Sequence, residues 1–114
     1  MEDVEELENE VSENEASENE AYQSLLQEII KEQHISPFEE ESVIIGYIKE
    51  AEYDINESCG SIIDYENDLK ARSLLKNYVL YAREKRLAEF KQLYAGEYAL
   101  LQAKYYQPTD IQWR

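Results

Sequence analysis

The sequence is poor in the residues that build chemical sites and multi-stranded folds. Its 114 residues include three glycines, two prolines, one histidine and one cysteine. So few turn-forming residues exclude a barrel or sandwich of many short strands. The lone cysteine, Cys59, excludes an intrachain disulfide and a zinc cluster built on several thiolates.

Long apolar stretches are missing as well. No segment approaches the roughly 20 apolar residues that a membrane-spanning helix needs. The first residues lack the basic and apolar parts of a secretory signal, so we expect an intracellular site of synthesis.

Basic residues are scarce. The chain has 11 Lys and Arg against 26 Asp and Glu, and its formal net charge is −15. This excess excludes non-specific attraction to nucleic acid or anionic lipid, which needs Lys and Arg beside the phosphates. The charge is unevenly placed: it is −10 over residues 1–20, −10 over residues 21–68 and +5 over residues 69–114.

Residues 1–21 form an acidic low-complexity arm. Three five-residue repeats follow one another at residues 8–12, 13–17 and 18–22. A period of five matches neither helix nor strand, so the arm has no apolar stripe to bury and we expect it to be disordered. A second interpretation stays open, in which the arm mimics nucleic-acid phosphates or docks on a basic partner.

Beyond the arm, apolar residues recur at helical spacing. This pattern predicts an all-α domain over residues 22–107, a small bundle of about four helices, followed by a short C-terminal tail at 108–114. We place the helices at about 21–34, 37–59, 67–84 and 87–105.

Several residues mark the expected helix ends. Ser36, Pro37 and Glu39 together predict a capping box at the start of the second helix. Gly60 predicts its left-handed stop. In the loop that follows, we expect Ile62 and Ile63 to be buried.

The later boundaries are less well defined by the residues. Asp64, Asn67 and Asp68 are alternative caps for the third helix. Residues 83–86 include no turn former, so the third and fourth helices either join through a slight bend or are separate.

No set of residues in the sequence predicts catalysis. His34 and Cys59 are not surrounded by any motif that would orient them as a base and a nucleophile. The phosphate-loop, dinucleotide, zinc-protease and EF-hand motifs are all missing. We therefore predict that the chain is not an enzyme and that it uses no metal or cofactor.

Tyrosines and charged stripes point instead to protein contacts. Ten tyrosines outnumber what one small core can hold, and tyrosine suits interfaces because it has an apolar body and a polar tip. An acidic stripe on the second helix and a basic stripe on the third, if that helix runs on, could meet between copies and close a ring. The contact candidates are Glu50, Asp54, Glu57, Arg72, Lys76, Arg83, Arg86, Tyr94, Tyr98, Tyr105 and Trp113.

Four patterned segments follow one another between residues 22 and 106. They are residues 25–30 leading to 39–41, residues 44–55 ending at Cys59-Gly60, residues 68–75 running on to 78–81, and the helix of Phe90, Tyr94 and Leu101. In this order they resemble the head–tail connector proteins of tailed bacteriophages, also called adaptor or head-completion proteins.

The resemblance implies a structural virion protein. Such a protein docks on the portal ring at the head vertex, joins head to tail and extends the DNA channel. The partners implied are the phage portal protein, a downstream head-completion or tail protein, and further copies of the chain in a homo-oligomeric ring. Genomic DNA would pass the channel without specific binding, and no membrane is involved. The implied location is the head–tail interface of the virion, with the host cytoplasm during assembly.

An alternative uses the same negative charge. The chain could be a small acidic regulatory binder or DNA mimic whose carboxylates occupy a basic nucleic-acid-binding site. A mimic should depend on residues 1–20 and lose affinity steeply with salt. A connector should depend on the tyrosine-rich helices instead.

Overall fold

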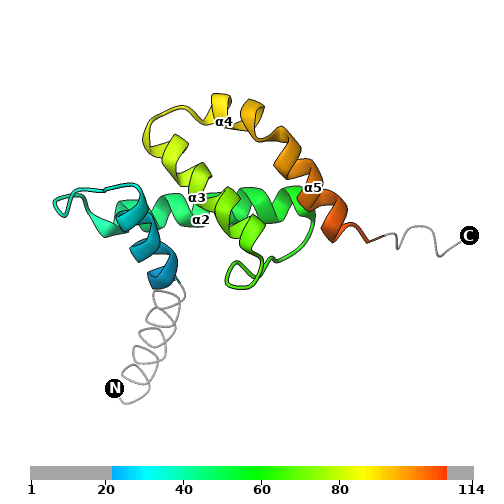
Figure 1. Ribbon diagram of the computed structural model, residues 1–114, viewed down its shortest axis with the longest axis horizontal. Coiled ribbons are helices and arrows are strands. Elements are labelled where there is room, and N and C mark those ends of the chain that lie inside the picture. Colours follow the sequence, from blue (N-terminus) through cyan, green and yellow to red (C-terminus); the bar gives the residue numbers. More distant parts are fainter. Residues whose placement is uncertain (1–21, 108–114) are drawn as a thin grey trace, which may run out of the picture. The chain divides into compact units, whose positions relative to one another are not determined.

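The computed structural model describes residues 22–107, and these residues form helices without any β-strand (Figure 1). The predicted all-α class is confirmed, with five helices among the described residues rather than about four. Residues 22–32 are helical, followed by α2 (Glu41–Cys59), α3 (Leu69–Arg83), α4 (Leu87–Leu93) and α5 (Ala95–Tyr105). The acidic arm at 1–21 and the tail at 108–114, which includes Trp113, lie outside the described residues.

The chain divides into two compact units, one up to Ile45 and the other from Gly46. In the first unit, the apolar side chains of Leu25, Leu26 and Ile29 share one buried helical face. This face follows from their spacing of one, three and four residues.

The predicted capping box is wrong. Ser36 Oγ accepts a hydrogen bond from the backbone N–H of Phe38 at 3.1 Å, and Ser36 O accepts one from Glu39 N–H at 3.1 Å. These bonds close a separate turn, because the serine side chain competes for a neighbouring N–H instead of capping a helix. As a result α2 begins at Glu41 rather than at Pro37.

Three helices end in the same backbone motif. Residues His34, Gly60 and Lys85 have φ values of 52°, 63° and 61°. In each case the following N–H reaches back to a carbonyl five residues earlier, as in Ser61 N to Asn56 O at 3.2 Å. This is the Schellman arrangement, which satisfies the last carbonyls of a helix. Of these three residues, only Gly60 indicates the motif in the sequence, and the predicted end of the second helix at Gly60 is confirmed.

Lys85 decides the question left open for the third and fourth helices. Arg86 N–H donates to Tyr81 O at 2.8 Å and Lys85 N–H donates to Ala82 O at 3.1 Å, which ends α3 at Arg83. The chain then reverses, and α4 turns back alongside α3 (Figure 1).

The expected fourth helix is two helices that meet at Tyr94. Tyr94 N–H still donates to Phe90 O at 2.9 Å, and Tyr98 N–H donates to Tyr94 O at 3.1 Å. Tyr94 itself has φ −105° and ψ 16°, outside the helical range. The axis therefore changes direction at Tyr94, although hydrogen bonding continues across it.

Phe90 lies at the centre of the second unit. Its side chain is fully buried, with ring centroids of Tyr78 at 5.4 Å, Tyr81 at 5.6 Å, Tyr94 at 4.9 Å and Tyr98 at 6.0 Å. The Tyr78 and Tyr98 rings meet it edge to face, and Tyr94 stacks on it, both favoured geometries for aromatic pairs. The tyrosines thus form one aromatic cluster with Phe90, and α3, α4 and α5 all contribute to it.

We expect Phe90→Ala to lower the free energy of unfolding by about 3–5 kcal/mol, because it removes a buried ring and leaves a cavity. Leu93→Ala on the same helix is the matched control and should change stability by less than about 0.5 kcal/mol, since Leu93 is exposed. Urea denaturation followed by circular dichroism measures both. Equal losses from the two variants would contradict the central role of Phe90.

Candidate functional site

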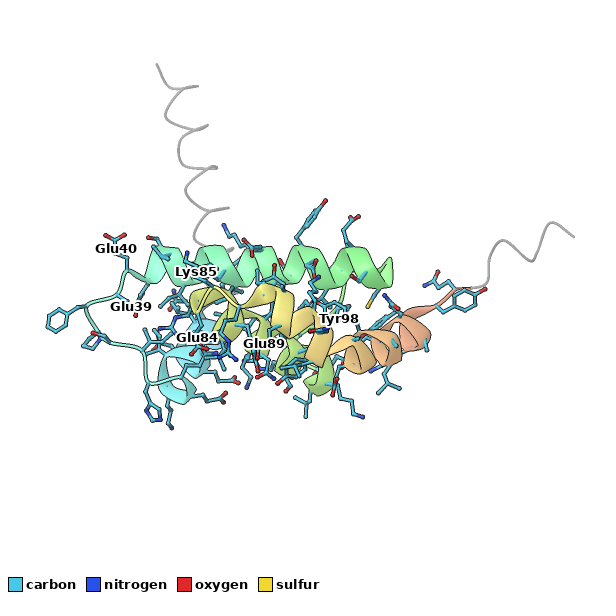
Figure 2. All side chains as sticks on the ribbon, turned by 90° about the horizontal axis from the view of Figure 1, so that it is seen from above. Glu39, Glu40, Glu84, Lys85, Glu89 and Tyr98 are labelled. Carbon is cyan, nitrogen blue, oxygen red and sulfur yellow. The ribbon has the colours of Figure 1, made fainter. Side chains whose placement is uncertain are left out.

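Tyrosine hydroxyls and carboxylates pair repeatedly in the second unit. Tyr78 Oη donates to Glu50 Oε2 at 2.8 Å, linking α3 to α2. Tyr98 Oη donates to Asp54 Oδ2 at 2.5 Å, linking α5 to α2 (Figure 2). These are charge-assisted hydrogen bonds, which are stronger than neutral ones.

A third tyrosine–carboxylate hydrogen bond lies at the C-terminal end of α5. Tyr105 Oη donates to Asp68 Oδ2 at 2.5 Å, and Lys104 Nζ lies 2.9 Å from the same oxygen. Asp68 Oδ1 meanwhile accepts from Ala71 N–H at 3.1 Å and caps α3. Asp68 is therefore the cap among the three alternatives that the sequence offered. Asp64 instead accepts from Glu66 N–H at 3.0 Å within the loop.

These contacts move the pKa values of the groups involved. Burial and the Glu50 carboxylate raise the pKa of Tyr78, and burial and the Asp54 carboxylate raise that of Tyr98. The hydrogen bond to Asp68 raises the pKa of Tyr105 to about 12. Burial works to raise the pKa of Asp68, but the bonds from Tyr105, Lys104 and Ala71 outweigh it and hold that pKa at about 2.

Two of the three acidic candidates are engaged within the chain. Glu50 is bound by Tyr78, and Asp54 is shared by Tyr98 and Lys91, whose Nζ lies 2.6 Å from Asp54 Oδ2. Glu57 is exposed. Most of the acidic stripe of α2 therefore bonds to α3, α4 and α5 within the second unit.

The basic candidates do not form one stripe, because α3 ends before Arg86. Arg72 is only 8% exposed, and its Nη1 donates to Tyr65 O at 3.1 Å. Lys76 and Arg83 are half-buried on α3.

Arg86 lies instead in the turn between α3 and α4 (Figure 2 labels the neighbouring Glu84, Lys85 and Glu89). It forms a bidentate pair with Glu89, at 2.7 Å and 2.6 Å, and a further ion pair with Glu84 at 3.2 Å.

The tyrosine candidates are also placed inward. Tyr98 is buried, while Tyr94 and Tyr105 are half-buried. Packing and hydrogen bonding within the chain therefore engage much of these three side chains, and their role in contacts with other chains stays a prediction. The loop residues split, since Ile63 is buried as predicted whereas Ile62 is 92% exposed, contrary to the prediction.

A groove between α3 and α5 is one concave feature that the described residues offer for binding. Its volume is about 450 Å³. Leu74 and Leu101 are buried at its base, and Leu100 is 63% exposed on its wall. The remaining lining residues are polar or aromatic: Lys70, Ser73, Asn77, Tyr94, Glu97 and Lys104. We call this feature the α3–α5 groove.

The sequence reasoning missed the groove. The signal that could have found it is the pair Leu100-Leu101, because two adjacent leucines on a helix cannot both face the same core. Leu101 is buried and Leu100 is left outward. An apolar base with a polar rim is typical of surfaces that take up an apolar side chain or segment of a protein.

Other chemistry among the described residues is sparse. Cys59 is buried, and burial followed by the nearby Asp68 carboxylate raises the pKa of its thiol. Within residues 22–107, no three His, Cys, Asp or Glu side chains are grouped to hold a metal ion. None of the helices in this part of the chain is both long and apolar enough to cross a bilayer.

Comparison with known proteins gives no match to a protein-family model, a curated protein or a solved structure.

We expect the free energy of unfolding to fall at acid pH, because protonation of Asp68 weakens its hydrogen bonds and its ion pair. Because the folded pKa of this carboxyl is held at about 2, below its ordinary value of 3.8, the stabilisation is present above pH about 4 and is lost as pH falls toward 2. Asp68→Asn should cost about 1–2 kcal/mol of unfolding free energy at neutral pH and flatten this acid dependence.

The measurement is urea denaturation at several pH values between 7 and about 2. Glu57→Gln, at an exposed carboxylate, is the matched control and should keep the parent's acid dependence. An Asp68→Asn variant with the same pH profile as the parent would show that Asp68 is not the responsible group.

Proposed function

We propose that this chain is a structural protein of a tailed bacteriophage, a head–tail connector that docks on the portal ring and extends the DNA channel. The observation that carries the proposal is the order of its patterned helical segments. Residues 44–55 lie within α2, residues 69–81 within α3, and Phe90 and Leu101 on α4 and α5. The last three of the four segments that resemble connector proteins are thus helical.

The internal contacts suit a part that must hold its shape in an assembly. The aromatic cluster around Phe90 and the tyrosine–carboxylate bonds join α2, α3, α4 and α5. A body stiffened in this way presents its surface to partners at low entropic cost. The net charge of −15 also fits a channel through which DNA must slide without being held.

The charge pattern suggests how copies would meet. Glu57 is exposed on α2, whereas Lys76 and Arg83 are half-buried on α3. A contact of Glu57 with Lys76 and Arg83 of the next copy would be heterologous, and its repetition with the right rotation would close a ring. Such complementarity would set the register of the ring more than its affinity.

A second function is favoured by one specific observation, the ten acidic and no basic residues among the first 20. Under this alternative the chain is a small acidic regulatory binder or DNA mimic. Its binding would then come from the arm and would depend strongly on salt.

The two functions are separated by testing the binding of the purified chain to phage portal oligomers, imaged by negative-stain microscopy at physiological salt. We expect an added ring of density on the outer end of the portal, which would give the copy number directly. A variant lacking residues 2–20 should form the same ring, because the helical body carries the contact. A bare portal with the full chain would overturn the connector proposal. Loss of binding only in the shortened variant would favour the acidic binder.

The ring contact has its own test. Lys76→Glu should reduce ring formation on the portal, because it places a like charge opposite Glu57 of the neighbouring copy. Lys85→Glu is the matched control, with the same change of charge at an exposed residue of the α3–α4 turn, and should assemble like the parent. Unchanged circular dichroism would confirm that both variants fold. Equal assembly of both variants would remove Lys76 from the contact and leave the portal result standing.

A further inference from the structure

The α3–α5 groove lies between two helices that run in opposite directions. At one end the start of α3 lies beside the end of α5, because Tyr105 donates a hydrogen bond to Asp68. At the other end the ring of Tyr81, near the end of α3, lies 6.0 Å from the ring of Tyr94, immediately before α5. The groove therefore has one end at the start of α3 and the other at the start of α5.

These two ends carry opposite charges. Lys70, in the first turn of α3, lines one end, and Glu97, in the first turn of α5, lines the other. Lys104 also lines the Lys70 end, but its ammonium is already paired with Asp68 at 2.9 Å. Lys70 and Glu97 are both exposed, and neither forms an ion pair among residues 22–107. They are the charges that the groove offers to a partner.

Leu100 is the outward apolar side chain between these charges. It is 63% exposed on the groove wall, whereas Leu74 and Leu101 are buried at the base. At 1.5 Å per residue, Leu100 lies about 4.5 Å along α5 from Glu97 and about 6 Å from Lys104, and so near the middle of the groove. The groove therefore reads acidic, apolar, basic in one direction and basic, apolar, acidic in the other.

We propose that the α3–α5 groove is the interface of a two-fold symmetric dimer of this chain. A two-fold axis beside Leu100 reverses the direction of the second copy, so Glu97 of each copy meets Lys70 of the other. Leu100 of each copy packs over Leu74 and Leu101 at the base of the other copy's groove. Such a contact is isologous, because the same patch serves both copies and every interaction occurs twice.

The surface beside Leu100 leaves room for a second helix. Gly96 and Ala103 lie four and three residues from Leu100, so the three residues share one face of α5, and all of them are exposed. An added Cβ at Gly96 would meet no atom within 4 Å, so no contact within the described part of the chain accounts for a glycine there. Residues this small let a neighbouring helix approach closely.

A second copy fits the groove because the groove is complementary to itself. An occupant has to bring a negative charge to Lys70, a positive charge to Glu97 and an apolar side chain between them. The rim of the same groove, reversed, meets all three requirements. The proposal does not rest on the connector function, since neither Lys76 nor Glu57 of the proposed ring contact lines the groove. While the dimer persists, the groove is closed to other partners.

Sedimentation velocity of the full-length chain at several concentrations tests the dimer. One groove and two ion pairs make a small interface, so we expect a dissociation constant in the micromolar range. Leu100→Glu should raise this constant by about tenfold or more, because it places a carboxylate at the apolar centre of the contact. Leu93→Glu is the matched control, since Leu93 is 59% exposed and does not line the groove, and it should dimerise like the parent.

Two charge reversals test the orientation of the copies. Glu97→Lys sets lysine against lysine at both rim contacts, and Lys70→Glu sets glutamate against glutamate, so each variant alone should dimerise several-fold more weakly than the parent. An equal mixture of the two variants should dimerise again. In the mixed dimer the new lysine of one copy faces the new glutamate of the other, and one native pair of Lys70 with Glu97 is kept. A mixture that dimerises no better than its components would overturn the two-fold arrangement.

Two results would overturn the proposal as a whole. One is a parent chain that stays monomeric up to about 1 mM. The other is a dimer that Leu100→Glu leaves unchanged while circular dichroism shows a folded variant, because that dimer would form through another surface. Lys76→Glu separates this proposal from the ring contact, since it should keep the dimer even where it reduces assembly on the portal.

Discussion

The arrangement of the second unit depends on the carboxylate of Asp68. One of its oxygens caps α3 through Ala71 N–H, and the other accepts from Tyr105 and Lys104 at the end of α5. A single buried charge thus joins the start of one helix to the end of another. It is stable there because three donors replace the water it loses on burial, which also holds its pKa at about 2. This link holds the end of α5 against the start of α3, the two helices that line the α3–α5 groove. Lys104 both lines the groove and pairs with Asp68.

The same chemistry explains why so acidic a chain is so rich in tyrosine. Glu50 and Asp54 would repel one another on one face of α2, but each accepts a tyrosine hydroxyl from a neighbouring helix. The tyrosine rings pack on Phe90 while their hydroxyls reach the carboxylates, so each side chain contributes to both the apolar and the polar contacts. The surface left for partners is therefore smaller than the composition suggests. It consists of outward apolar side chains such as Leu100 and of charges such as Glu57.

The helix interiors could be predicted from periodicity, whereas several boundaries could not. Gly60 marks its stop in the sequence, but His34 and Lys85 adopt the same left-handed conformation without glycine. A positive φ strains the backbone of a residue other than glycine. At His34 and Lys85 this strain is offset because the Schellman hydrogen bonds satisfy otherwise unpaired carbonyls. At Ser36 the sequence predicted a helix cap that the structure does not contain. A serine hydroxyl can close a local turn as readily as it caps a helix. For the candidate site, the partners of Glu50, Asp54 and Asp68 on other helices could not be read from spacing within one helix.

The sequence by itself determined the helical class, the buried faces, the stop at Gly60 and the uneven charge, because each depends on neighbouring residues or on composition. Only the tertiary structure decided that α3 and α4 separate at Lys85, that Arg72 is buried, and that Glu50 and Asp54 are engaged within the chain. It also decided that Leu100 faces a groove rather than a core. The physical reason is that hydrogen bonds and burial between helices depend on which faces meet. Residues such as Asp54 and Tyr98, 44 positions apart, carry no local sign that they will bond.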